Sequence, residues 1–342
     1  MSVLAQGTAK EQTSAPLLEV DNLRVGFAPD GREIRAVDGV SFRVGPGATL
    51  AIIGESGSGK TVSCRAIMGL LPAGAVVTGS ARLRGTELIG LSDRQLRRHR
   101  GADIAMVFQD PSRSLNPTMR VGAQVAEAIR AHRPVTRSQA RDQAIELLRR
   151  VRIPLPAQRY YEYPHQLSGG MRQRVMIAMA LACRPRLLIA DEATTALDVT
   201  TQAQIMELLL DLQAELDMAL IMISHDLGLA ASYASEIVVM YAGKIVEQAP
   251  AARLLGQHPT VRMRYTRALL DAIPHLERPA HAVLPVVSGR PPDPAALPPG
   301  CPFAPRCGSA EDDCLTTAPM LLEHVPGHRW ACWYPCQNGD TA

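Results

Sequence analysis

A single short stretch carries the residue types and spacing that bind nucleoside phosphates. It matches the phosphate-binding loop pattern Gly-x4-Gly-Lys-Ser/Thr and comprises Gly54, Glu55, Ser56, Gly57, Ser58, Gly59, Lys60 and Thr61. The glycines let backbone N–H groups converge on phosphate oxygens at a helix N-terminus. Lys60 adds a positive charge for the terminal phosphates, and the Thr61 hydroxyl is a magnesium ligand. For the loop alone, the alternative is a glycine-rich turn that precedes Lys-Thr by chance.

Two carboxylates and a histidine follow apolar runs further along the chain. Asp191 and Glu192 come after the run 186–190, and His225 comes after the run 219–224. Ligands bind at the carboxyl edge of an open parallel sheet, so these side chains are expected at one site. We predict that Asp191 holds magnesium through its water shell and that Glu192 polarises the water that attacks the γ-phosphate. His225 would donate to the γ-phosphate or to Glu192. The alternative for the acidic pair is a solvated turn.

Four further features are weaker candidates when each is taken alone. Gln109 follows the apolar run 104–108, and its amide could reach magnesium or the attacking water. Ser168 is a good helix cap, and Gly169 and Gly170 leave the helix N-terminus bare, which suits a second anion site but also suits a plain turn. Phe27 could stack on a purine, or it could equally be a core aromatic of the neighbouring strands. The remaining nucleotide-site candidate is Asp198, which precedes a helix expected over 202–216.

These residues need a parallel sheet with helices around it. Buried strands are predicted at 49–53, 104–108, 186–190 and 219–224, and a hairpin at 236–246. Shorter β-type runs at 18–25, 40–44 and 79–91 indicate an antiparallel lid beside the nucleotide strand. Residues 117–160 show helical periodicity that stops at Pro154 and Pro156, which predicts a helical subdomain over about 112–183. The fold class is therefore an α/β phosphate-loop NTPase, with residues 1–16 as a disordered lead-in.

Composition narrows the possible classes of protein. The chain has 342 residues, of which 46% are hydrophobic and 20% are charged, as in a globular protein. No apolar run approaches the roughly 20 residues that cross a bilayer, and residues 1–14 lack a signal-peptide core, so we expect a cytoplasmic chain. A net charge of +3 does not argue for nucleic acid as a partner.

The order of these motifs resembles the nucleotide-binding subunit of ATP-binding cassette (ABC) transporters, over about residues 17–270. The motifs are the phosphate loop, Gln109, Leu167-Ser168-Gly169-Gly170, Asp191-Glu192 and His225. The resemblance implies a RecA-like core sheet, an antiparallel lid and a helical subdomain. It also implies that Ser168, Gly169 and Gly170 serve the nucleotide of a partner subunit, and that two bound ATP molecules close the pair. The chain has no Asn/Thr-Lys-x-Asp motif, which counts against a GTPase.

The stretch 106–117, with sequence MVFQDPSRSLNP, and the stretch 38–42 before the loop narrow the resemblance to the ATPases of oligopeptide/dipeptide importers. This resemblance implies ATP-driven import of peptides with a second homologous ATPase, two transmembrane permease subunits and an extracytoplasmic binding protein. It places the chain peripherally on the cytoplasmic face of the membrane. The helical segment 112–165 would receive the coupling helix of a permease.

The C-terminal region is rich in proline and cysteine. Ten prolines lie within 274–305, which predicts a stiff connector over 271–299, and five of the seven cysteines follow residue 300. A small tail over 300–342 in a reducing compartment needs a stabilising cross-link other than a disulfide. Four cysteine thiolates could supply one by binding zinc or an iron–sulfur cluster. The resemblance to the peptide-importer ATPases implies a [4Fe-4S] cluster. Its implied ligands are Cys301, Cys307, Cys314 and Cys332, with zinc and free thiols as alternatives and with His324, His328 and Cys336 as other possible ligands.

Two other functions fit parts of the pattern. A soluble ABC-type mechanical ATPase for DNA repair or ribosome work would typically show a coiled-coil insertion, a zinc hook or two fused cassettes, and none is visible in the sequence. A non-enzymatic nucleotide-gated scaffold would be expected to lose Glu192 or His225, and both are present.

Overall fold

The computed structural model describes residues 15–28, 32–193, 198–256, 259–273 and 287–337. Most of the predicted lead-in, and half of the predicted proline-rich connector, therefore lie outside the described residues.

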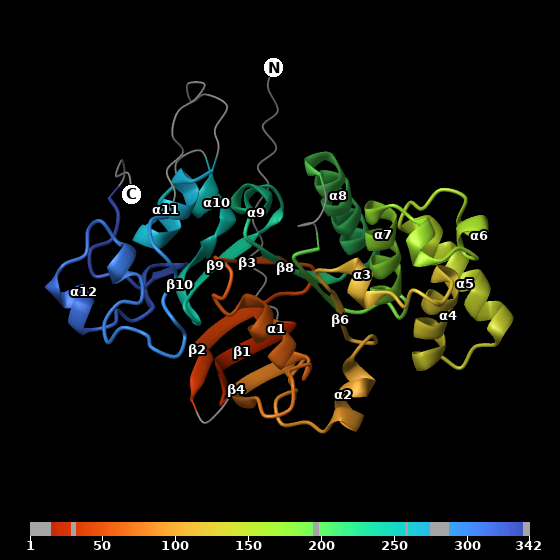
Figure 1. The fold of residues 1–342 in the computed structure, drawn as a ribbon, viewed down its shortest axis with the longest axis horizontal. Helices are drawn as coiled ribbons and strands as arrows, with labels where there is room; N and C mark the ends of the chain where they lie inside the picture. Colours follow the sequence, from red (N-terminus) through yellow and green to blue (C-terminus); the bar gives the residue numbers. More distant parts are fainter. Residues whose placement is uncertain (1–14, 29–31, 194–197, 257–258, 274–286, 338–342) are drawn as a thin grey trace, which may run out of the picture.

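A mixed sheet occupies the centre of the described structure (Figure 1). Its strand order is β11-β12-β10-β9-β3-β8-β7-β6, and the strands from β9 to β6 run parallel to one another. Strands β3, β7 and β8 are buried along their whole length, as expected for apolar strands covered on both faces. The bounds are β3 (Thr49–Ile53), β6 (Ile104–Val107), β7 (Leu187–Asp191), β8 (Ala219–Ser224), β9 (Glu236–Tyr241), β10 (Lys244–Pro250), β11 (Leu322–Val325) and β12 (His328–Trp330).

A second, antiparallel sheet forms the predicted lid. Its order is β2-β1-β4-β5. Its apolar face packs with α1 and one face of the central sheet in a shared hydrophobic core. The bounds are β1 (Leu18–Phe27), β2 (Ile34–Val44), β4 (Val76–Leu83), β5 (Thr86–Glu87), α1 (Lys60–Ile67) and α2 (Asp93–His99).

The predicted helical subdomain projects from the β6 end of the central sheet (Figure 1). Thr136 begins α5 with a capping box that includes Gln139. After α5, Pro156 stands in the first turn of the short helix α6, where a missing N–H costs nothing. The helices are α3 (Pro111–Ser114), α4 (Val121–His132), α5 (Arg137–Arg150), α6 (Pro156–Arg159) and α7 (Gly169–Ala180).

The other helices pack around the central sheet or lie in the tail. They are α8 (Val199–Leu216), α9 (Leu227–Tyr233), α10 (Ala251–Leu255), α11 (Arg264–Asp271) and α12 (Asp312–Thr316). Within the described ranges, none of the helices combines the length and the apolar character needed to cross a membrane.

The tail joins the central sheet. Strand β12 pairs antiparallel with β10, and the β11–β12 hairpin thereby extends the sheet at its edge. Beneath this pairing, the fully buried Glu247 carboxylate lies 2.8 Å from His328 Nε2 and accepts backbone hydrogen bonds from Arg262 and Met263. The tail and the helical subdomain lie on opposite sides of the molecule (Figure 1).

Candidate functional site

The phosphate-binding loop connects β3 to α1, as the sequence predicts. Three of its glycines have positive φ, and two of these, Gly54 and Gly59, leave no space for a side chain. A Cβ on Gly54 would lie 2.2 Å from the Met240 carbonyl oxygen, and one on Gly59 would lie 2.6 Å from the Ala36 carbonyl oxygen. The loop is therefore held against β9 and β2 by backbone approaches that only glycine permits.

Lys60 lies almost wholly buried at the first position of α1. Its Nζ donates to the carbonyl oxygens of Gly54 at 2.7 Å and Glu55 at 2.9 Å. Burial lowers the pKa of the Lys60 ammonium, and the nearby carboxylates of Glu192, Asp191 and Glu55 oppose that shift. A buried cation whose present partners are backbone carbonyls is well suited to exchange them for phosphate oxygens.

Asp191 ends β7 directly beside the loop. Thr61 Oγ1 donates to Asp191 Oδ1 at 2.6 Å, and burial raises the pKa of the Asp191 carboxyl. The second oxygen, Oδ2, is buried without a hydrogen-bond partner in the described residues, and Arg65 lies 3.7 Å from it. A hydroxyl and a carboxylate with an unsatisfied buried oxygen are hard oxygen donors, so these residues fit a magnesium ion.

Glu192, Gln109 and His225 meet at the carboxyl edge of the sheet. Gln109 Nε2 donates to Glu192 Oε2 at 2.7 Å, and His225 Nδ1 lies 4.0 Å from the same oxygen. Glu192 itself has a φ of +46°, a strained conformation for a side-chain-bearing residue. The structure thus brings together three residues that follow the ends of β6, β7 and β8 and lie far apart in the sequence.

Ser168 and Asp198 both act as helix caps. Ser168 Oγ accepts a hydrogen bond from the Met171 N–H at the start of α7, and Asp198 Oδ1 accepts one from the Thr201 N–H at the start of α8. A Cβ on Gly170 would lie 3.0 Å from Thr201 Cγ2, so the two helix starts are adjacent. Among the described residues, no hydrogen bond or ion pair joins 168–170 to the phosphate loop of the same chain. Phe27 is half-buried and packs against the lid core.

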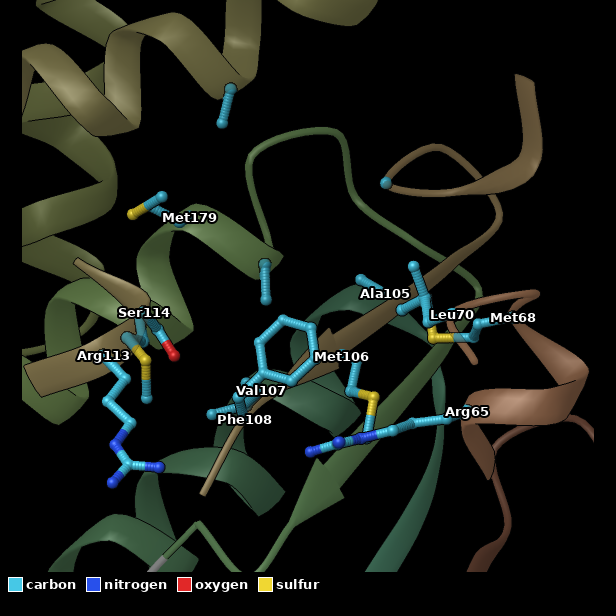
Figure 2. Close-up of a pocket in the computed structure, with 14 residues that line it drawn as sticks. Arg65, Met68, Leu70, Ala105, Met106, Val107, Phe108, Arg113, Ser114 and Met179 are labelled. Carbon is cyan, nitrogen blue, oxygen red and sulfur yellow. The ribbon is translucent and has the colours of Figure 1, made fainter. Parts of the chain in front are cut away.

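An open pocket lies between the central sheet and the helical subdomain. Its volume is about 670 Å³. Figure 2 shows the Phe108 ring in its middle, with the side chains of Arg65 and Arg113 on either side. Phe108 directly precedes Gln109 and is 36% exposed. The other lining residues are Met68, Leu70, Gly101, Ala105, Met106, Val107, Ser114, Ala128, Met176, Met179 and Ala180.

The four predicted cysteine ligands line one small cavity in the tail. Cys301, Cys307, Cys314 and Cys332 all border a space of about 20 Å³, whereas Cys336, His324 and His328 do not. Burial raises the pKa of the Cys301 and Cys307 thiols, and it raises that of Cys332 to about 11. No group of three or more Cys, His, Asp or Glu side chains in the described part of the chain is close enough together to hold a metal ion.

Sequence reasoning missed two residues that contact the loop. Arg306, in the tail, forms a two-pronged ion pair with Glu55, and Tyr265 in α11 accepts a hydrogen bond from the Glu55 N–H at 2.8 Å. Neither residue belongs to a motif, and both lie more than 200 positions from Glu55 in the sequence. The sequence alone therefore carried no signal for these contacts.

The sheet, the lid, the helical subdomain and the placement of Asp191 and Glu192 define a protein of the ATP-binding cassette class. Residues 37–195 match the ABC transporter family model. A dimeric ATP-binding cassette in a post-hydrolysis state with ADP and phosphate superposes with a TM-score of 0.62 at 28% identity, over 68% of this chain and 98% of that one. CbiO1 from Clostridium perfringens, part of an ABC transporter complex, has a TM-score of 0.60 at 27% identity, over 71% of this chain and 92% of that one.

Within that class, the chain belongs to the ATP-binding proteins of the oligopeptide/dipeptide transporter family, whose C-terminal region model matches residues 246–314. It is 46% identical to the oligopeptide transport ATP-binding protein OppD of Salmonella typhimurium, over 99% of both chains. It is 50% identical to a putative peptide import ATP-binding protein of Brucella suis, over 90% of this chain and 92% of that one. The OppD of Mycobacterium tuberculosis is 49% identical over 93% of this chain, which spans about half (52%) of that longer protein.

Proposed function

We propose that this chain is the ATP-hydrolysing subunit that powers a membrane importer of peptides. The observation that carries the proposal is the assembly at one sheet edge of the Lys60 loop, the Thr61–Asp191 pair and the Gln109–Glu192–His225 group. Peptides as cargo follow from the family and from its relatives, which are named as oligopeptide transport or peptide import proteins.

The site residues divide the work of phosphoryl transfer to water. The loop amides and Lys60 bind the phosphates, and Thr61 and Asp191 would hold magnesium, which supplies positive charge to the phosphate oxygens when bound. Glu192 accepts the proton of the attacking water, while Gln109 and His225 orient its carboxylate. Ser168, Gly169 and Gly170 offer the bare end of α7 to the γ-phosphate held by a second, homologous ATPase. Asp198 is assigned to the same shared nucleotide site, and Phe27 to the adenine.

The pocket around Phe108 supports a membrane partner. It is open and largely apolar, carries a cation on each side, and adjoins the Gln109 segment, so a helix docked there would bear directly on the hydrolytic group. The proposed partners are two permease subunits, one of which inserts a coupling helix, together with an extracytoplasmic binding protein. In this assembly the chain sits peripherally at the membrane.

The cysteine cavity supports a metal–thiolate centre in the tail. Four thiols that border one cavity are the donor set used by zinc and by a [4Fe-4S] cluster. As the described structure stands, these thiols are not close enough together to hold a metal ion, so loading with zinc or with a cluster would require the four side chains to move toward one another. We propose the cluster, with zinc as the alternative occupant, and Cys301, Cys307, Cys314 and Cys332 as its ligands.

The test of the proposed activity is Glu192→Gln. Removal of the general base should lower ATP turnover by at least ~100-fold while ATP binding persists. Turnover is measured by phosphate release and binding by titration with ATP. Glu215→Gln, which alters an exposed glutamate on α8, is the matched control and should keep full activity. Undiminished hydrolysis by Glu192→Gln would refute the role assigned to Glu192.

A further inference from the structure

Arg306 is held in the tail by an unusually complete set of contacts. Its Nη1 donates to Glu55 Oε2 at 2.6 Å and to the Tyr241 hydroxyl at 3.2 Å, and its Nη2 donates to Glu55 Oε1 at 2.9 Å and to the Val287 carbonyl at 3.1 Å. Its Nε donates to the Ser288 carbonyl at 2.7 Å. All five guanidinium N–H donors therefore have partners, and only 4% of the side chain is exposed.

The partner of Arg306 is a residue of the phosphate loop itself. Glu55 is the second residue of the loop, and its carbonyl oxygen accepts one of the hydrogen bonds from Lys60. Its N–H donates to Tyr265, whose ring packs with Tyr241 and Phe303. The side chain and the backbone N–H of Glu55 are thus both fixed by groups outside the loop.

We propose that Arg306 is a positioning residue for the phosphate loop, through which the C-terminal tail sets the affinity for nucleotide. The inference rests on the proposed function and assigns a role to a residue outside every nucleotide-binding motif. The contact crosses 251 positions of sequence and ties the segment between Cys301 and Cys307 to the start of the loop.

The physical reason lies in what happens when phosphate enters. Lys60 now holds the loop through the Gly54 and Glu55 carbonyls, and it must give up these bonds to reach phosphate oxygens. The Arg306–Glu55 pair and the Tyr265 hydrogen bond remain, so the loop keeps its shape as Lys60 leaves. A bidentate guanidinium–carboxylate pair with a buried arginine and a partly buried glutamate can hold the loop in a fixed position.

The experiment measures the affinity of the full chain for Mg-ADP by calorimetric titration, because ADP needs only the chain's own loop. Arg306→Ala and Glu55→Ala should each raise the Kd for Mg-ADP about tenfold, which corresponds to a loss of ~1.4 kcal/mol in binding free energy. The double variant should be no worse than either single one, since both remove the same contact. Arg306→Lys should stay impaired, because an ammonium cannot supply the planar fork. For Arg306→Ala, ATP turnover at saturation should stay near that of the wild type, since Arg306 touches no reacting atom.

The matched control is Arg262→Ala, which removes a tail contact to the Cys336 carbonyl without touching the loop. It should leave ADP affinity unchanged even where it lowers the melting temperature. Three results would overturn the inference: unchanged affinity in Arg306→Ala and Arg306→Lys, additive single effects, or tighter binding by Glu55→Ala, which would indicate simple charge repulsion. If the wild type binds no nucleotide, the proposed function fails instead.

Discussion

At the scale of single residues, the sequence predicts those that act through a short motif. Lys60, Thr61, Asp191 and Glu192 stand next to apolar strands, and the parallel sheet brings strand ends to one edge. Arg306 could not be found in this way, because its role depends on a contact made by folding the tail against the loop. The strained φ of Glu192 was equally invisible, since neighbouring residues do not specify it.

A single substitution can decide whether Phe27 stacks on adenine or only packs in the lid core. If its ring stacks on adenine, Phe27→Ala should weaken ATP binding about tenfold, because stacking on an aromatic contributes about 1–3 kcal/mol. Competition by tripolyphosphate, which has no base, should be unchanged in the same variant, and Phe27→Tyr should retain affinity for ATP. A lower melting temperature with unaltered ATP affinity would instead assign Phe27 to the lid core, against which it packs.

At the scale of elements, the strands and helices that carry strong periodicity were predicted well. The predicted strand at 219–224 is β8, the hairpin at 236–246 is formed by β9 and β10, and the predicted helix over 202–216 is α8 with one more turn at its start. The hairpin of β11 and β12 was not predicted. Its strands are short and half polar, and they are stabilised by pairing with β10 and by the buried Glu247–His328 contact, so local sequence carries little signal for them.

The metal content of the tail is a prediction at this scale, because its four proposed ligands come from separate segments of the tail that the fold brings together. Full-length protein purified without oxygen should contain iron and acid-labile sulfide, and Cys301→Ser should lose both. Cys183→Ser, which alters a half-buried cysteine of the core, is the matched control and should keep them. If the protein contains stoichiometric zinc and no sulfide, the site binds zinc and not a cluster. If it contains neither zinc nor iron, the proposed metal–thiolate centre is wrong.

At the scale of the whole molecule, the proposed sharing of nucleotide between two subunits rests on where α7 and the phosphate loop lie in one chain. Ser168 caps the start of α7, and among the described residues no hydrogen bond or ion pair links it to the chain's own phosphate loop. The tail lies on the other side of the molecule from α7, and it contacts the phosphate loop through the Arg306–Glu55 ion pair. This separation supports the proposal that ATP lies between two subunits, with the phosphate loop of one and the start of α7 of the other on either side of it.

Ser168→Arg tests this division in the assembled transporter. A bulky cation at the start of α7 should remove the anion site that faces the partner's nucleotide, and ATP hydrolysis by the complex should fall about 100-fold. The affinity of this chain's own loop for ADP should change less than about twofold, because Ser168 does not contact it. Thr136→Arg, which removes the side-chain cap at the start of α5, controls for the loss of a helix cap and should leave hydrolysis intact. If Ser168→Arg weakens ADP binding to the isolated chain as strongly as Lys60→Ala does, the start of α7 serves the same subunit and the paired arrangement is wrong.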